Sequence, residues 1–177
     1  ASLQDMMRTY KLAHGNDLSR FGEFYAVQLN DTHPAMSIPE LIRLLMKEGM
    51  SFDEAFKVAQ KTFSYTNHTV LGEALEKWPL NLMRSVVPQI ADIICKIDHK
   101  MRTDLPMDYL ERRANKLFII DEDIVHMANL SIFVGSYVNG VAEIHSKILV
   151  DDVFNKWYKV FPERFQNKTN GITPRRW

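Results

Sequence analysis

Two short apolar stretches separated by a pair of helices place the strongest limit on the fold of this chain. The stretches Phe24–Leu29 and Phe63–Thr66 have the length and composition of buried strands. Between them, Ser37–Gly49 and Ser51–Thr62 carry helix start and stop residues, and the second begins with a capping box. A strand, two helices and a second strand form the crossover unit of a parallel sheet. We therefore expect a helix-rich α/β fold.

The rest of the chain continues this alternation. A long helical region from Pro79 to Met101 should be interrupted at Pro88, because proline removes a helical hydrogen bond. A further helix is expected at Thr103–Lys116. The apolar run Met127–Val134 is interpreted as a third strand, and residues 139–150 have a helical pattern.

The polar stretch Tyr65–Pro79 is the main candidate for a functional site. It begins with hydrogen-bonding side chains around His68 and then turns into a short predicted helix that carries Glu73, Glu76 and Trp78. A sugar site needs many donors and acceptors, because a buried hydroxyl pair left unmatched costs about 1–3 kcal/mol. The alternatives for this cluster are a metal site and a helix-capping arrangement.

A second polar segment, Asn30–Pro34, follows the first predicted strand. Ligand sites in open α/β sheets lie at the carboxyl ends of the strands. Asp31 and His33 are therefore candidate site residues. The alternative is an ordinary strand-to-helix loop that is rich in capping residues.

Composition excludes several classes of partner. The formal net charge is +0 and the pI is near 7.2, which argues against a nucleic acid or an anionic membrane surface. The single cysteine, Cys95, excludes an internal disulfide and favours a reducing, cytoplasmic compartment. No apolar run approaches the roughly 20 residues that a transmembrane helix needs.

Other kinds of chemistry have weaker support in the sequence. The histidines His33, His68, His126 and His145, with Asp31, lack the helical spacing of zinc hydrolases, so we expect no metal site. A glycine-rich nucleotide loop and a G-x-S-x-G nucleophile elbow are both absent.

A pair of carboxylates offers one hydrolytic alternative. Glu73 and Glu76 lie three residues apart and could form the paired carboxylates of a glycoside hydrolase. Such a pair is more often a solvated helix face or a first helical turn. The residues alone thus indicate a mixed α/β protein that handles carbohydrate.

Several blocks of sequence, spread along the whole chain, carry a family resemblance. They are Ser2–Asp5, Val27–Pro34, Ile38–Leu41, Tyr65–Leu71, Glu73–Glu76, Trp78–Pro79, Val138–Ala142, Ile144–Ser146 and Phe165–Trp177. In these blocks and in their order, the chain resembles the α-glucan phosphorylases, which include the glycogen, starch and maltodextrin phosphorylases.

The resemblance implies a particular fold and reaction. The fold would be part of a doubly wound, Rossmann-like domain from the N-terminal half of a GT-B-type glycosyltransferase. Such enzymes split the terminal α-1,4 bond of a glucan with inorganic phosphate and release glucose 1-phosphate with retention. They use pyridoxal 5'-phosphate, whose phosphate group exchanges protons with the substrate phosphate.

The resemblance also assigns site residues. His68 would be the catalytic residue of this chain: its backbone carbonyl would face the anomeric carbon and its ring the 6-hydroxyl. A carbonyl dipole there would stabilise an oxocarbenium-like transition state. Asn170 would bind the 6-hydroxyl, Asp31 and His33 would line the pocket, and Glu76 would line a polar side cavity.

By the same resemblance, residues 1–177 form a single fragment of the N-terminal domain, with residues 169–177 at the junction to the C-terminal domain. The lysine that carries pyridoxal phosphate would lie outside the chain, so we expect the fragment alone to be inactive and its parent to be a homodimer. A non-catalytic carbohydrate-binding module is the competing interpretation.

One position departs from the family pattern. Phosphorylases that AMP activates carry two adjacent arginines after the first block, where this chain has Arg8 and Thr9. A threonine cannot supply the forked donors that hold a phosphate. We therefore expect no activation by AMP.

Overall fold

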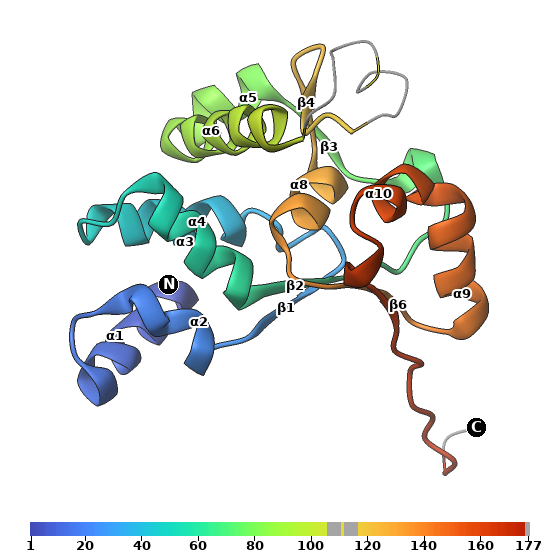
Figure 1. Ribbon diagram of the computed structural model, residues 1–177, viewed down its shortest axis with the longest axis horizontal. Coiled ribbons are helices and arrows are strands. Elements are labelled where there is room, and N and C mark those ends of the chain that lie inside the picture. The colour runs from blue at the N-terminus through green and yellow to red at the C-terminus, as the bar shows by residue number, and fades with distance from the viewer. Residues whose placement is uncertain (106–110, 112–116, 176–177) are drawn as a thin grey trace.

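A parallel sheet lies at the centre of the molecule (Figure 1). The computed structural model describes residues 1–105, 111 and 117–175. Within this part, one four-stranded sheet has the order β1-β2-β6-β7, and each neighbouring pair is parallel. Its strands are Val27–Asn30 (β1), Phe63–Thr66 (β2), Val138–Gly140 (β6) and Phe165–Asn167 (β7). Because the order runs in one direction, right-handed connections place the crossover helices on one face.

The two faces of the sheet differ in polarity because side chains alternate along a strand. Leu29, Phe63, Tyr65 and Val138 are buried on the helix-covered face. On the other face, Gln28 of β1 donates to Thr66 of β2 (2.7 Å), and Thr66 donates to Asn139 of β6 (2.9 Å). Polar side chains therefore join three strands on the face without crossover helices.

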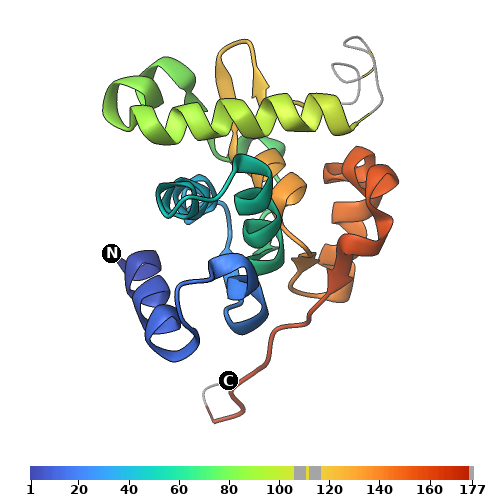
Figure 2. The same ribbon diagram turned by 60° about the vertical axis from the view of Figure 1, so that its left-hand side comes forward.

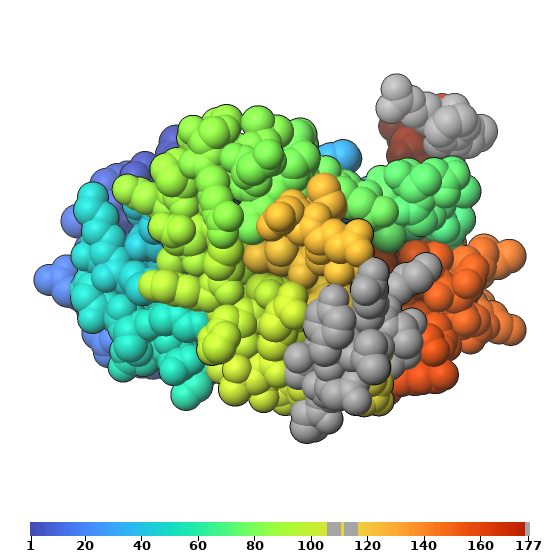
Figure 3. Space-filling view, turned by 90° about the horizontal axis from the view of Figure 1, so that it is seen from above, coloured from blue at the N-terminus to red at the C-terminus, as the bar shows by residue number. Residues whose placement is uncertain are grey.

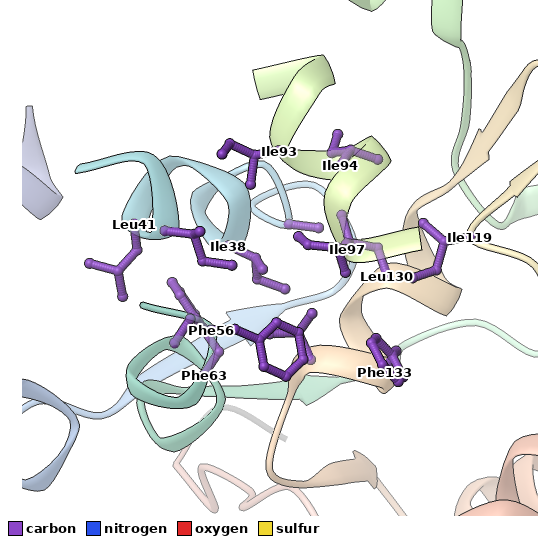
Figure 4. Close-up of a cluster of buried hydrophobic side chains, with 14 of the residues drawn as sticks. Ile38, Leu41, Phe56, Phe63, Ile93, Ile94, Ile97, Ile119, Leu130 and Phe133 are labelled. Carbon is purple, nitrogen blue, oxygen red and sulfur yellow. The ribbon is translucent and has the colours of Figure 1, made fainter. Parts of the chain in front are cut away.

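The first helical layer covers the apolar face. It contains α3 (Ser37–Lys47), α4 (Phe52–Thr62) and α8 (Met127–Val134). The expected capping box is confirmed, since the Ser51 side chain accepts from the Glu54 backbone and Glu54 accepts from Ser51 in return. Figure 4 shows the core that these helices share with β2 and α6, including Ile38, Phe56, Phe63, Ile97, Leu130 and Phe133.

A second layer lies over the first (Figure 2). It consists of α5 (Leu80–Val86) and α6 (Pro88–Asp104), and the expected interruption at Pro88 is confirmed. Seen from above, the β4–β5 hairpin lies at the edge of these helices (Figure 3). The hairpin pairs Ile120–Asp121 (β4) with Ile124–His126 (β5), and Lys77–Pro79 (β3) pairs with β5.

The remaining helices and helical turns lie on either side of the sheet in Figure 1. They are α1 (Ser2–His14), a 3₁₀ turn (Leu18–Arg20), α2 (Phe21–Phe24), a 3₁₀ turn (Gly72–Ala74), α9 (Glu143–Ile148), a π-helix (Leu149–Val153), α10 (Asn155–Val160) and a 3₁₀ turn (Pro162–Arg164). No helix in the described ranges is both long and apolar enough to cross a bilayer. The fold is thus a helix-rich α/β arrangement with a parallel sheet, compatible with part of a Rossmann-like domain, as expected.

One predicted strand is wrong. Residues Met127–Val134 form helix α8, not a third strand. Its apolar residues are buried between the sheet and α6, so the run is hydrophobic on all sides and carries no helical period. Periodicity alone cannot separate a buried helix of this length from a buried strand.

Two further expectations need correction at their boundaries. The predicted helix that carried Glu73, Glu76 and Trp78 is only the 3₁₀ turn Gly72–Ala74, because pairing with β5 draws the following residues into β3. The helix expected over residues 139–150 starts at Glu143, since its first residues belong to β6. The helix expected at Thr103–Lys116 lies largely outside the described residues.

Arg164, which is distant in the sequence, donates hydrogen bonds to the carbonyl groups at the end of α8. Helix C-termini leave carbonyl groups without helical partners. The Nη1 atom of Arg164 lies 3.2, 2.9 and 3.3 Å from the carbonyl oxygens of Ile132, Phe133 and Gly135. Burial lowers the pKa of Arg164, whose guanidinium also lies 3.8 Å from the ring centroid of Phe161. A charged donor therefore joins the segment before β7 to the end of α8.

The contact between Gly140 and α9 generates a prediction. A Cβ atom at Gly140 would lie 2.9 Å from the backbone N and Cα of Ser146, whereas one at Gly72 would meet nothing within 4 Å. We expect Gly140→Ala to lower the free energy of unfolding by about 1–3 kcal/mol through overpacking. Gly72→Ala, the matched control, should change it by less than about 0.5 kcal/mol. Chemical denaturation compares the two, and equal effects would contradict the proposed close packing.

Candidate functional site

The carboxyl ends of the parallel strands bring most of the predicted site residues to one edge of the sheet. Asp31 directly follows β1, His68 follows β2 by two residues, and Asn170 follows β7 by three. Ligand sites of open α/β sheets lie at this edge. Residues that are more than a hundred positions apart in the sequence thus belong to one set of neighbouring loops.

The first loop is shaped by Asp31. Its backbone has a φ of 66°, a left-handed conformation that aspartate tolerates better than most residues. Its N–H donates to the carbonyl of Thr66 (2.9 Å), which continues the pairing of β1 with β2 beyond the strand end. Its carboxylate accepts the N–H of Thr32 (2.7 Å). The loop is therefore held on the inside by Thr32 while His33 remains exposed.

The second loop presents His68 through a buried neighbour. Asn67 is fully buried: its Oδ1 accepts the N–H of Thr69 (2.9 Å) and its Nδ2 donates to the hydroxyl of Tyr65 (2.9 Å). An asparagine that bonds two residues ahead forms a local turn. His68, between the two bonded residues, is consequently exposed at the tip of this turn.

The loop after β7 runs beside the end of β6. The N–H of Lys168 donates to the carbonyl of Gly140 (3.1 Å), and the N–H of Asn170 donates to the carbonyl of Val141 (2.9 Å). On the other side of β6, the N–H of Asn67 donates to the carbonyl of Asn139 (2.9 Å). The backbones that carry His68 and Asn170 therefore flank the same strand end, although no hydrogen bond among the described residues joins their side chains.

Glu76 connects the first loop to β3. One carboxylate oxygen accepts from the hydroxyl of Thr32 (3.0 Å) and the other from the indole N–H of Trp78 (2.7 Å). The imidazole Nδ1 of His33 lies 3.5 Å from the first of these oxygens. The structure thus brings Glu76 together with the loop of Asp31 and His33, and it fixes the carboxylate as an acceptor.

Glu73 has a different environment. It is exposed on the 3₁₀ turn, and it shares with Glu76 the lining of a pocket of about 700 Å³. The two residues do not lie on one helical face, because Glu76 follows the end of that turn. Both oxygens of Glu76 accept hydrogen bonds from protein donors, whereas Glu73 is exposed, so the two carboxylates have different environments.

The four histidines considered as metal ligands do not form a group in the described part of the chain. In the described part of the chain, no group of three or more histidine, cysteine or acidic side chains has metal-binding geometry. His126 lies in β5, where it pairs with Lys77 of β3, and burial lowers its pKa. His145 lies near His68, but its ring bonds the backbone of Val141.

The sequence interpretation passed over several residues that shape the site. Thr32 and Asn67 are buried polar residues one or two positions beyond the ends of β1 and β2. Their positions within polar segments that follow strands were the available signal. The partner of Thr32, Glu76, lies 44 residues away, so this contact could not be predicted from spacing.

The bond between Thr32 and Glu76 generates a prediction. Thr32→Val removes the buried hydroxyl while keeping a similar shape, and we expect it to lower the free energy of unfolding by about 1–2 kcal/mol. In a Glu76→Ala background the same substitution should cost at least about 0.5 kcal/mol less. Chemical denaturation of the four proteins of this cycle measures both terms. An equal cost in both backgrounds would mean that the hydroxyl does not act through Glu76.

Comparison with known proteins identifies the family. The family described as carbohydrate phosphorylase matches residues 1–177. The chain is 46% identical to glycogen phosphorylase 2 of Dictyostelium discoideum, with 100% of the chain and 18% of that protein covered. It is 47% identical to the cytosolic α-glucan phosphorylase 2 of Arabidopsis thaliana (100% and 22%) and 46% identical to the maltodextrin phosphorylase of Streptococcus pneumoniae (92% and 21%). The chain spans about a fifth of the length of these relatives. It belongs to the carbohydrate phosphorylase family.

Proposed function

We propose that this chain forms one wall of the sugar site of an α-glucan phosphorylase. The enzyme would transfer the terminal glucosyl unit of an α-1,4-glucan to inorganic phosphate and yield glucose 1-phosphate with retention. The observation that carries the proposal is the assembly of Asp31, His68 and Asn170 at the carboxyl edge of one sheet in a chain of this family.

The chemistry of the loops suits a glucosyl unit. A sugar hydroxyl needs both a donor and an acceptor, and His68 and Asn170 offer both kinds of atom from exposed positions. We propose that they hold the 6-hydroxyl, while the His68 carbonyl faces the anomeric carbon and stabilises positive charge there in the transition state. Asp31, His33 and Glu76 would form the polar side of the pocket.

The exposure of these side chains agrees with an incomplete pocket. His33, His68 and Asn170 are exposed, and Asp31 and Glu76 are partly buried. A site that acts on sugar in a low-dielectric environment must exclude water when the substrate is bound. We propose that other parts of the full-length protein close the pocket over these loops.

The residues of these loops do not fit pyridoxal phosphate. A Schiff-base lysine is activated by desolvation or by a neighbouring charge, whereas Lys168, the lysine of these loops, is exposed. The described chain also lacks a glycine-rich phosphate loop. We propose that residues outside this chain hold the cofactor, which supplies a phosphate group for proton exchange when bound. The residues described here would bind and orient the sugar.

The same family assignment suggests the setting of the enzyme. We propose a cytoplasmic homodimer that takes an α-1,4-glucan and inorganic phosphate as substrates. Support for the compartment comes from the lone cysteine and from the cytosolic Arabidopsis thaliana relative. Charge neutrality gives no support to a nucleic-acid partner.

The reaction is tested with the full-length protein, pyridoxal phosphate and a linear maltodextrin. Release of glucose 1-phosphate should require inorganic phosphate, and Asn170→Ala should lower kcat/KM at least about tenfold, because a sugar hydroxyl loses its partner. Asn16→Ala, at an exposed asparagine in the turn between α1 and the 3₁₀ turn Leu18–Arg20, is the matched control and should leave kcat/KM within about twofold. Free glucose without phosphate would instead support the hydrolase, and binding without turnover would support the non-catalytic module.

The regulatory prediction concerns the first helix. Arg8 is followed by Thr9, and the Arg8 guanidinium is already paired with Asp5 at 2.7 Å. We expect no more than about 1.5-fold stimulation of the full-length enzyme by AMP, because a phosphate would lack a forked pair of arginines. Initial rates with and without AMP measure this. Strong activation would show that nucleotide binding relies on other residues.

A further inference from the structure

A histidine outside the predicted site connects the loop of His68 with the loop of Asn170. His145 lies on α9, which begins three residues after the end of β6. Its Nδ1 accepts a hydrogen bond from the backbone N–H of Val141 (3.0 Å). Its other ring nitrogen, Nε2, is fully buried and has no complete hydrogen bond with a described residue. The imidazole is thus held at one nitrogen and enclosed at the other.

The hydrogen bond from Val141 fixes the protonation of this ring. A nitrogen that accepts a hydrogen bond carries no proton, so the imidazole is neutral and its proton lies on Nε2. Burial lowers the pKa of His145, the charge of His68 lowers it further, and the backbone of Thr69 has the opposite effect. The residues that shift the pKa of His145 are therefore His68 and Thr69, which follow Asn67 in the second loop.

Val141 continues the connection toward the loop of Asn170. Its N–H is bonded to His145, and its carbonyl accepts the N–H of Asn170 (2.9 Å). One peptide segment therefore has His145 on one side and the backbone of Asn170 on the other. The ring itself lies next to the loop of His68. The His145 side chain thus bonds the Val141 segment and lies close enough to His68 and Thr69 for both to affect its pKa.

We propose that His145 is a positioning residue of the sugar site, a neutral imidazole that holds Val141, and through it Asn170, in register with the loop of His68. The proposal rests on the proposed function, since it concerns how the two partners of the 6-hydroxyl are kept at their spacing. His145 itself does not touch the sugar. Its effect on turnover comes from the orientation of His68 and Asn170.

A simpler role for the same bond is local. His145 lies in the first turn of α9, and its bond to Val141 could serve only to fix the start of that helix. A purely local role would lower stability and would affect all substrates alike. A positioning role would affect most the substrate group that His68 and Asn170 hold. The 6-hydroxyl therefore distinguishes the two roles.

Three substitutions of His145 distinguish the role of Nδ1 from that of Nε2. His145→Asn keeps an acceptor near the position of Nδ1, so it preserves the bond from Val141. His145→Gln places its amide near the position of Nε2 and loses that bond. His145→Leu removes both polar atoms while filling similar space. Thermal melting of each full-length variant shows which of them fold, and His145→Gln serves in place of His145→Leu if the leucine variant does not.

The experiment measures glucan extension by the full-length holoenzyme with two donors, glucose 1-phosphate and its 6-deoxy analogue. With glucose 1-phosphate, His145→Leu and His145→Gln should lower kcat/KM about tenfold, and His145→Asn should stay within about threefold of wild type. With the 6-deoxy analogue, kcat/KM of all three variants should stay within about threefold of the wild-type value for the same donor. The analogue lacks the hydroxyl that His68 and Asn170 would hold, so their orientation no longer matters.

Two results would overturn the proposal. Equal losses with both donors, or a leucine variant as active as wild type, would assign His145 a local role in α9. A wild-type enzyme that turns over neither donor would refute the proposed function, and the role of His145 would fall with it. The first pair of outcomes leaves the phosphorylase assignment intact, so the two failures are distinct.

Discussion

Backbone hydrogen bonds between the parallel strands continue beyond the strand ends and hold the loops of the site against one another. Asp31 bonds to the end of β2, Asn67 to β6, and Asn170 to the residue after β6. Each bond extends the sheet pairing by one or a few residues into what would otherwise be free loop. The relative positions of the His68 and Asn170 backbones are therefore set by the sheet and not by contacts between the two side chains.

Local signals predicted much of this fold. The capping box at Ser51, the strand Phe63–Thr66 and the interruption at Pro88 depend on residues next to them in the sequence, and each was predicted where it occurs. The failures have tertiary causes. Met127–Val134 is buried on all sides, which removes its helical period, and the segment after Ala74 becomes a strand because β5 is available to pair with it.

The candidate site, like the fold, was predicted from the sequence only in part. Motif resemblance supplied the identities of Asp31, His68 and Asn170, and the position of Asp31 beyond a strand agrees with general rules for α/β sheets. The contacts that orient the site were not predictable, because they join distant segments. Glu76 is held by Thr32 from a loop 44 residues earlier, and His145 acts on a backbone whose partner is 29 residues away. Buried polar networks of this kind are specified only when all their members are in place.

The guanidinium of Arg164 has a consequence for how the chain reaches this structure. It supplies the donor for carbonyls at the end of α8 that lie 29 to 32 residues earlier. During synthesis at about 5–20 residues per second, those carbonyls emerge seconds before their partner does. The end of α8 must remain hydrated until Arg164 leaves the ribosome, and the same arrival brings β7 to the sheet. The last loop of the proposed sugar site is therefore assembled in one late step, together with the end of a helix in the core.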